Sequence, residues 1–161
     1  MNRYLPAALA VFVAFVFVQS LAFKFTGSEE TVIIFGTIAK WMADIGLPAG
    51  FAGGFGRYGG IVVGLGELTA SGLVLVPRTR LWGAIIGWFV ISGAIFFHLF
   101  TPLGINRVVD AAGNTDGGVL FMMACGVWLS CTGMIFLSRQ QLLNCLGYPA
   151  VSTADSKMTQ P

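Results

Sequence analysis

A few ionisable side chains interrupt long apolar runs in this chain, and these are the residues that could do chemistry. Glu67 is the clearest case, because it lies near the middle of the apolar stretch 57–76. A carboxylate at the centre of a bilayer is costly, so it must face protein or trapped water. There it could take up and release a proton. The alternative is a structural role, in which Glu67 joins two helices by hydrogen bonds.

Three basic residues fall near the ends of the same runs. Lys24 follows the first run, Arg57 begins the second and His98 lies two residues before the end of the third. Glu67 follows Arg57 by ten residues, about 15 Å along a helix. The four side chains could therefore line a polar cavity in the outer half of the membrane, with Glu67 at its floor. For Lys24 and Arg57 the alternative is snorkelling to the interface, and for His98 it is a helix-end hydrogen bond.

The spacing of small residues predicts that Glu67 points inward. Gly60, Gly64 and Ser71 share its helical face, and small residues at this spacing let a second helix approach closely. We therefore expect Glu67 to lie in a helix–helix seam. His98 shares a helical face with the small residue Gly87, so we expect His98 to turn inward as well.

The apolar runs themselves predict an all-α integral membrane protein. Of the 161 residues, 56% are hydrophobic and 10% are charged, against about 25% charged in soluble domains. A short turn around Pro77 makes the second and third runs an antiparallel hairpin, so we expect a four-helix bundle. The predicted spans, each near the roughly 20 residues that a bilayer requires, are Leu5–Phe23, Arg57–Val76, Leu81–Phe100 and Gly118–Leu137.

The basic residues near the span ends predict the topology. Arg78 and Arg80 occupy the tight turn, and Arg3 and Arg139 flank the first and last spans. By the positive-inside rule we expect both termini in the cytoplasm. The first run has some features of a signal peptide, but we expect it to be retained as a member of the bundle.

The long segment between the first two spans predicts an additional amphipathic helix. Ser28 is a typical helix cap, and Glu29 and Glu30 suit the first helical turn. Gly46 and Pro48 would end the helix. Its apolar stripe is expected to consist of Val32, Phe35, Ala39 and Met42. Such a helix could lie flat on the membrane or fold over the mouth of the bundle as a lid.

The loop before the last span contains further candidate residues. We expect Asp116 to cap the fourth span by accepting hydrogen bonds from free backbone N–H groups. Arg107 and Asp110 are expected near the mouth of the cavity.

Several functions are poorly supported by the sequence. The net charge of +2 does not suggest nucleic-acid binding, and no phosphate-binding, flavin or metal-binding motif is evident. Cys125, Cys131 and Cys145 do not form a close pair along the chain, which argues against thiol–disulfide catalysis. A single histidine cannot supply a bis-histidine haem site.

Taken in order, several short motifs make this chain resemble the DoxX family. The motifs are Lys24–Thr31, Arg57–Gly60 with Glu67 downstream, Pro77–Arg80, His98–Phe100 and Asp116–Gly118. The family consists of small four-helix bacterial membrane proteins named for an association with a quinol oxidase and with thiosulfate:quinone oxidation. The resemblance implies a DoxX-like four-span domain over residues 1–140 and a quinone-linked or redox-partner role. Residues 141–161 are then a cytoplasmic tail, which we expect to be mobile.

Two functional hypotheses follow. In the first, the protein is a redox-associated component that binds a quinone or a small anionic or sulfur compound in an outer-half pocket. Glu67 and His98 would handle protons, and the substrate-binding residues would be Lys24, Arg57, Tyr58 and Arg107. In the second, it is a non-catalytic accessory subunit that packs against a larger respiratory or other electron-transfer complex. Transport of a small solute is less well supported, because no inverted repeat is visible.

Overall fold

The computed structural model describes residues 4–139 and residue 143, and within them all of the regular structure is helical apart from one isolated bridge between Val108 and Thr115. Four of the five helices are long and apolar enough to cross a membrane, which confirms an all-α protein with four candidate spans. The helices are α1 (Leu5–Thr26), α2 (Glu29–Asp44), α3 (Ala49–Leu75), α4 (Arg80–Phe100) and α5 (Val119–Leu137). Apart from Leu143, the predicted tail over 141–161 lies outside the described residues.

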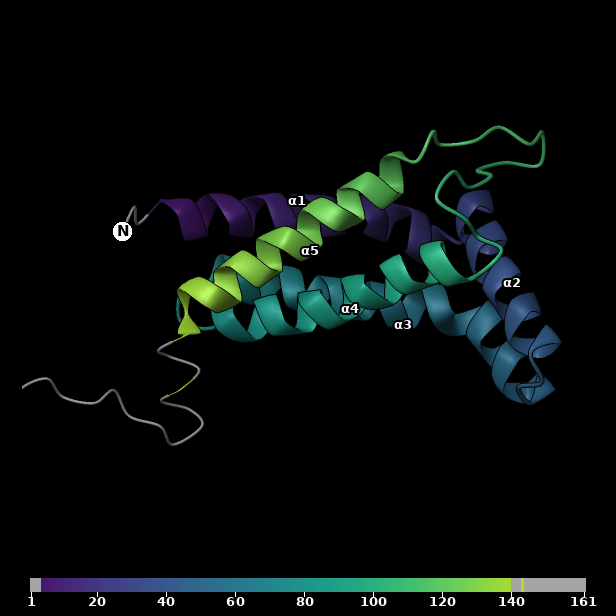
Figure 1. The fold of residues 1–161 in the computed structure, drawn as a ribbon, viewed down its shortest axis with the longest axis horizontal. Coiled ribbons are helices and arrows are strands. Elements are labelled where there is room, and N and C mark those ends of the chain that lie inside the picture. The colour runs from purple at the N-terminus through teal and green to yellow at the C-terminus, as the bar shows by residue number, and fades with distance from the viewer. Residues whose placement is uncertain (1–3, 140–142, 144–161) are drawn as a thin grey trace, which may run out of the picture.

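The four long helices form a ring of neighbouring contacts. Helix α1 packs against α3 and α5, and α4 packs against the same two helices. Helix α1 begins and α5 ends at one end of this arrangement, and α2 lies crosswise over the other end (Figure 1). We call α2 together with residues 101–118 the cap.

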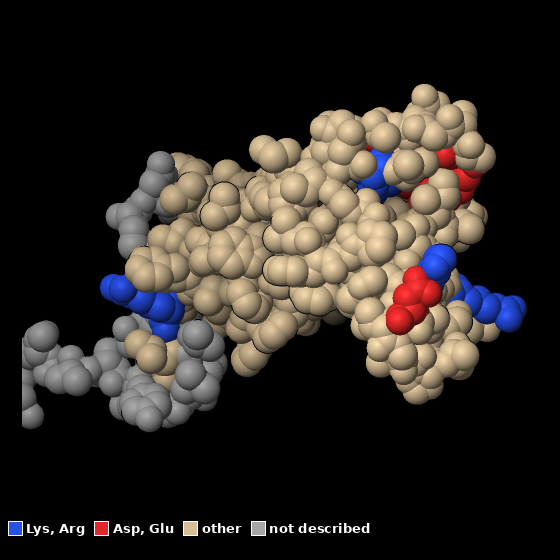
Figure 2. Space-filling model, turned by 45° about the vertical axis from the view of Figure 1, so that its right-hand side comes forward, with Lys and Arg blue, Asp and Glu red and all other residues tan. Residues whose placement is uncertain are grey.

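Charged side chains gather at the two ends of the molecule. On the face in view in Figure 2, Lys, Arg, Asp and Glu leave the middle of the surface free of charge. An uncharged belt is what a bilayer environment requires. Together with the four candidate spans, it supports a multi-pass membrane protein.

The helices of the bundle approach each other closely at glycine positions. A Cβ atom added at Gly83 of α4 would lie 2.5 Å from the backbone nitrogen of Val74 in α3. At Gly64 of α3 it would lie 2.8 Å from the ring of Phe25, near the end of α1. These glycines therefore allow α3 to approach both neighbours, as small residues do in membrane bundles.

Helix α3 begins at Ala49, well before the predicted start at Arg57. The added turns contain several glycines, which are poor helix formers. They are nevertheless helical because this segment packs on the cap, where Ala52 of α3 is buried with Ile38 and Met42 of α2. Tertiary packing therefore overrides local propensity here.

Helix α2 occupies the segment in which an additional helix was expected. The Ser28 side chain accepts a hydrogen bond from the backbone N–H of Thr31, which confirms the predicted cap. Val32 is 63% exposed, so its expected place on the inner stripe was wrong. The stripe is displaced because α2 packs on the glycines of α3 through Phe35. The buried residues of α2 are Thr31, Phe35, Ile38 and Met42.

Candidate functional site

Glu67 lies buried in the seam between α1 and α3, as the sequence predicted. Lys24 Nζ lies 3.0 Å from Glu67 Oε1 and 2.8 Å from Oε2. Ser20 Oγ donates to Glu67 Oε2 at 2.8 Å, and Lys24 Nζ donates to Ser20 Oγ at 2.9 Å. The side chains of Glu67 and Lys24 are only 7% and 17% exposed. We call these three residues the Glu67 cluster.

Local sequence explains how the Glu67 cluster forms. Ser20 and Lys24 are four residues apart on α1 and therefore share one face of that helix. On α3, Gly64 is buried on the Glu67 side and packs against Phe25 of α1, which lets the two helices approach closely beside the ion pair. The i, i+4 spacing of Ser20 and Lys24 was the signal that could have identified Ser20 as a site residue.

The Glu67 cluster forms part of the wall of a chamber of about 590 Å³. All five helices and the loop over residues 101–118 contribute to its lining, which is mainly aliphatic and aromatic. Of the four residues expected to line a cavity, Lys24, Glu67 and His98 do so. The other polar lining residues are Gln19, Ser20, Glu30, Thr31, Arg107 and Asp116.

Arg107 is a charged residue of the chamber wall that is almost completely buried. Its side chain is 2% exposed and forms an ion pair with Glu30, and its Nε lies 3.6 Å from Asp116 Oδ2. Neither Nε nor Nη1 has a hydrogen-bond partner among the described residues. Buried donors are almost always paired in folded proteins, so these N–H groups can bind an acceptor in the chamber. Glu30 and Asp116 were not predicted as site residues.

Further hydrogen bonds join the elements of the cap on either side of Arg107. The Glu29 carboxylate accepts the backbone N–H of Ala111, which ties the start of α2 to the loop. Asp116 accepts the backbone N–H groups of Gly118 and Leu120. The predicted capping role of Asp116 is therefore confirmed, although Gly118 occupies the cap position itself.

His98 is buried at the end of α4 and faces the chamber. Its Nδ1 lies 2.6 Å from the backbone oxygen of Gly104. A carbonyl oxygen can only accept, so Nδ1 carries the proton. In the neutral ring Nε2 is then the acceptor. The ring also makes an edge-on contact with Phe121.

Arg57 and Tyr58 do not line the chamber, unlike the geometry expected from the sequence. Both are exposed, and the Arg57 guanidinium lies 5.3 Å from the centre of the Tyr58 ring. A guanidinium at this distance from an aromatic ring makes a favourable cation–π contact. Arg57 instead lines a smaller hollow of about 250 Å³, which it shares with Lys24.

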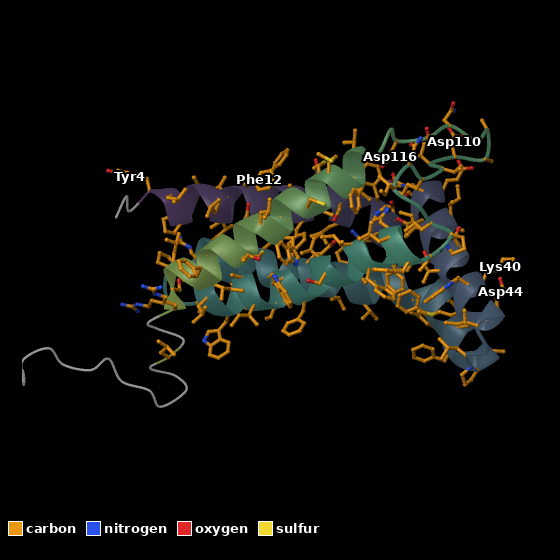
Figure 3. The ribbon with its side chains drawn as sticks, viewed as in Figure 1. Tyr4, Phe12, Lys40, Asp44, Asp110 and Asp116 are labelled. Carbon is orange, nitrogen blue, oxygen red and sulfur yellow. The ribbon has the colours of Figure 1, made fainter. Side chains whose placement is uncertain are left out.

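Asp110 lies in the loop between α4 and α5 next to the lining residue Val109, although it is not itself part of the chamber lining (Figure 3). A hydrogen bond from the Asn114 side chain holds the pKa of the Asp110 carboxyl below its ordinary value of 3.8. Its role is therefore to shape the loop.

The remaining candidate chemistry is limited. Cys125 and Cys131 are free thiols, and Cys145 lies outside the described residues. No group of three His, Cys, Asp or Glu side chains in residues 4–139 is arranged to hold a metal ion.

No known protein family, curated protein or solved structure matches this chain. The resemblance to the DoxX family rests on the sequence motifs alone.

Proposed function

We propose that this chain is a DoxX-like, redox-associated membrane protein that binds a quinone in the chamber. The observation that carries the proposal is the buried Glu67 cluster in the wall of an otherwise apolar cavity. Sites for small organic molecules typically have about 300–1,000 Å³ of space and a few polar groups on an apolar wall. The chamber, at about 590 Å³, falls within that range.

The polar groups suit the chemistry of a quinone. As a quinone accepts electrons from a redox partner, its carbonyl oxygens take up protons and become hydroxyl groups. Glu67 and His98 are the lining residues whose side chains are of the types that pass protons to or from a reacting oxygen. Arg107 offers free N–H donors that a carbonyl oxygen accepts.

The charges in the lining favour a neutral ligand over an anion. Two basic residues, Lys24 and Arg107, face three carboxylates, those of Glu30, Glu67 and Asp116. With His98 neutral, the formal sum is −1, and each basic residue already has an acidic partner. An added anion would therefore be repelled, whereas an uncharged carbonyl would not. We accordingly prefer a quinone to the anionic or sulfur compounds considered from the sequence.

We further propose that α2 is an amphipathic lid that lies over the chamber at the outer membrane surface, with both termini in the cytoplasm of a bacterial inner membrane. The support for the lid is that α2 contributes Glu30, Thr31 and Phe35 to the chamber lining. The alternative function, an accessory subunit that packs against a larger complex through the glycines of α3, has less support. Gly59, Gly60 and Gly64 already pack against Phe25 and Phe35 of the same chain.

The proposal is tested by quinone binding to the purified protein in lipid nanodiscs. The probe is decylubiquinone, and binding is followed by quenching of tryptophan fluorescence. We expect saturable binding by the wild type and weaker binding by Glu67→Gln and Arg107→Gln. Lys40→Gln is the matched control, because Lys40 is exposed on α2 and lies outside the chamber (Figure 3).

The opposite result would contradict the proposal. Quenching that does not saturate, or that is the same in all three variants and the wild type, would show that the chamber does not bind the quinone. If other membrane proteins also copurified in fixed proportion, the accessory-subunit hypothesis would be preferred.

A further inference from the structure

The most exposed residues of the chamber lining lie along one seam between two of the long helices. Of the lining residues, all of which are described, only Gln19, Phe23 and Val119 are exposed. Phe23 is 51% and Val119 58% exposed. Gln19 and Phe23 belong to the second half of α1, and Val119 is the first residue of α5. The chamber therefore opens between these two helices.

The cap covers the chamber on the side where α2 and the loop lie. Its lining residues on that side are buried or half-buried, with Leu103 at 8% and Arg107 at 3% exposure. The ion pair of Arg107 with Glu30 joins the loop to α2 across this side. A ligand that came through the cap would have to break this buried pair, which is costly.

The seam between α1 and α5 is tight at one end and loosely joined at the other. Deeper in the bundle, a Cβ atom at Gly126 would lie 3.2 Å from the Phe12 ring, so the helices touch there. Toward the cap, a side-chain hydrogen bond between the two helices runs from Gln19 Nε2 to Met123 Sδ at 3.7 Å. Thioether sulfur is a weak acceptor, so this contact can open at small cost.

From this geometry we infer that the seam bounded by Gln19, Phe23 and Val119 is a lateral portal, through which the ligand passes between the lipid and the chamber. The inference rests on the proposed function and adds the source and class of the ligand. Phe23 and Val119 make the mouth apolar, and ions do not cross such a mouth readily. The ligand is therefore a neutral molecule dissolved in the membrane, with a carbonyl or similar acceptor for Arg107.

The portal is tested by the rates of ligand exchange, since a residue at a mouth changes rates and leaves affinity unaltered. Decylubiquinone binding to the wild type and to Val119→Phe in nanodiscs is followed by stopped-flow quenching. The larger ring should slow association and dissociation by the same factor, about tenfold, with Kd changed less than about twofold. Phe23→Ala should accelerate both rates. Met122→Phe is the control, because Met122 is 69% exposed on the same helix but is not in the lining.

The outcomes separate this inference from the proposed function. If the wild type binds no decylubiquinone saturably, the proposed function fails and the portal with it. If the wild type binds but Val119→Phe exchanges as fast as Met122→Phe, only the portal is overturned. A change in Kd with an unaltered dissociation rate would equally overturn it. The association rate should also follow the mole fraction of quinone in the lipid, and a rate set by its aqueous concentration would indicate access through the cap.

Discussion

Removing the charges of Lys24 and Glu67 one at a time should destabilise the protein far more than removing both. Lys24→Met leaves a carboxylate that is 7% exposed with Ser20 as its remaining side-chain donor. Breaking a buried ion pair costs about 3–5 kcal/mol, and we expect the lower end, about 3 kcal/mol, because Ser20 still donates to the carboxylate. Glu67→Leu should cost less, about 2 kcal/mol. The ammonium of Lys24 is 17% exposed and near a helix end, so it can turn toward the interface.

The double variant Lys24→Met/Glu67→Leu replaces the pair by apolar side chains of similar size. Such replacements are often neutral in buried sites, and we expect a loss of about 1 kcal/mol from the Ser20 hydrogen bond. The coupling free energy between the two positions should thus be about 4 kcal/mol, somewhat above the usual range of about 0.5–3 kcal/mol for residues in contact. Glu67→Gln keeps an acceptor for Ser20 and Lys24 and should cost only about 1 kcal/mol.

The measurement is equilibrium unfolding by SDS in mixed micelles at neutral pH. The control cycle uses Lys40 and Asp44, an i, i+4 pair on α2 whose side chains are 77% and 59% exposed. Exposed helical pairs couple by about 0.3–0.5 kcal/mol. If the Lys24 and Glu67 effects add within about 0.5 kcal/mol, or couple no more than the control pair, the account of the Glu67 cluster is wrong.

Two further predictions test the packing and the cap. Gly83→Ala should destabilise the protein by about 1–3 kcal/mol in the same unfolding assay, because the added Cβ would meet the α3 backbone, which cannot move aside. Gly93→Ala, at a helical site with nothing within 4 Å, should be neutral or stabilising, so equal effects at both sites would contradict the packing. In the loop, Asn114→Ala should raise the pKa of Asp110 toward 3.8 as measured by carboxyl NMR. Because the pKa of Asp110 is lower in the folded state, the carboxylate stabilises the fold above its ordinary pKa, and this stabilisation is lost as the pH falls through the lowered pKa. If the titration of Asp110 were unaltered in Asn114→Ala, the Asn114 side chain would not be the cause of the lowered pKa.

The sequence predicted the membrane spans well because the bilayer imposes both their length and their composition. The third span was expected at Leu81–Phe100 and α4 runs from Arg80 to Phe100. The inward direction of Glu67 was also predictable, since a lipid-facing carboxylate is costly and small residues shared its face.

Other features depend on contacts that no local pattern reports. Glu30 and Arg107 are 77 residues apart in the sequence, and their pairing follows from the way the cap folds. The early start of α3 likewise depends on packing against α2.

The ion pair between α1 and α3 has a consequence for how the chain is made. Its two residues are 43 positions apart, and the whole of α2 is synthesised between them. Helix α3 is the least hydropathic of the four spans and carries the carboxylate. Its transfer from the translocon into lipid is therefore most favourable once α1 is already in the membrane and presents Lys24 and Ser20. We therefore expect the first helix to assist the insertion of the second span, so that the order of the helices along the chain favours assembly of the ion pair.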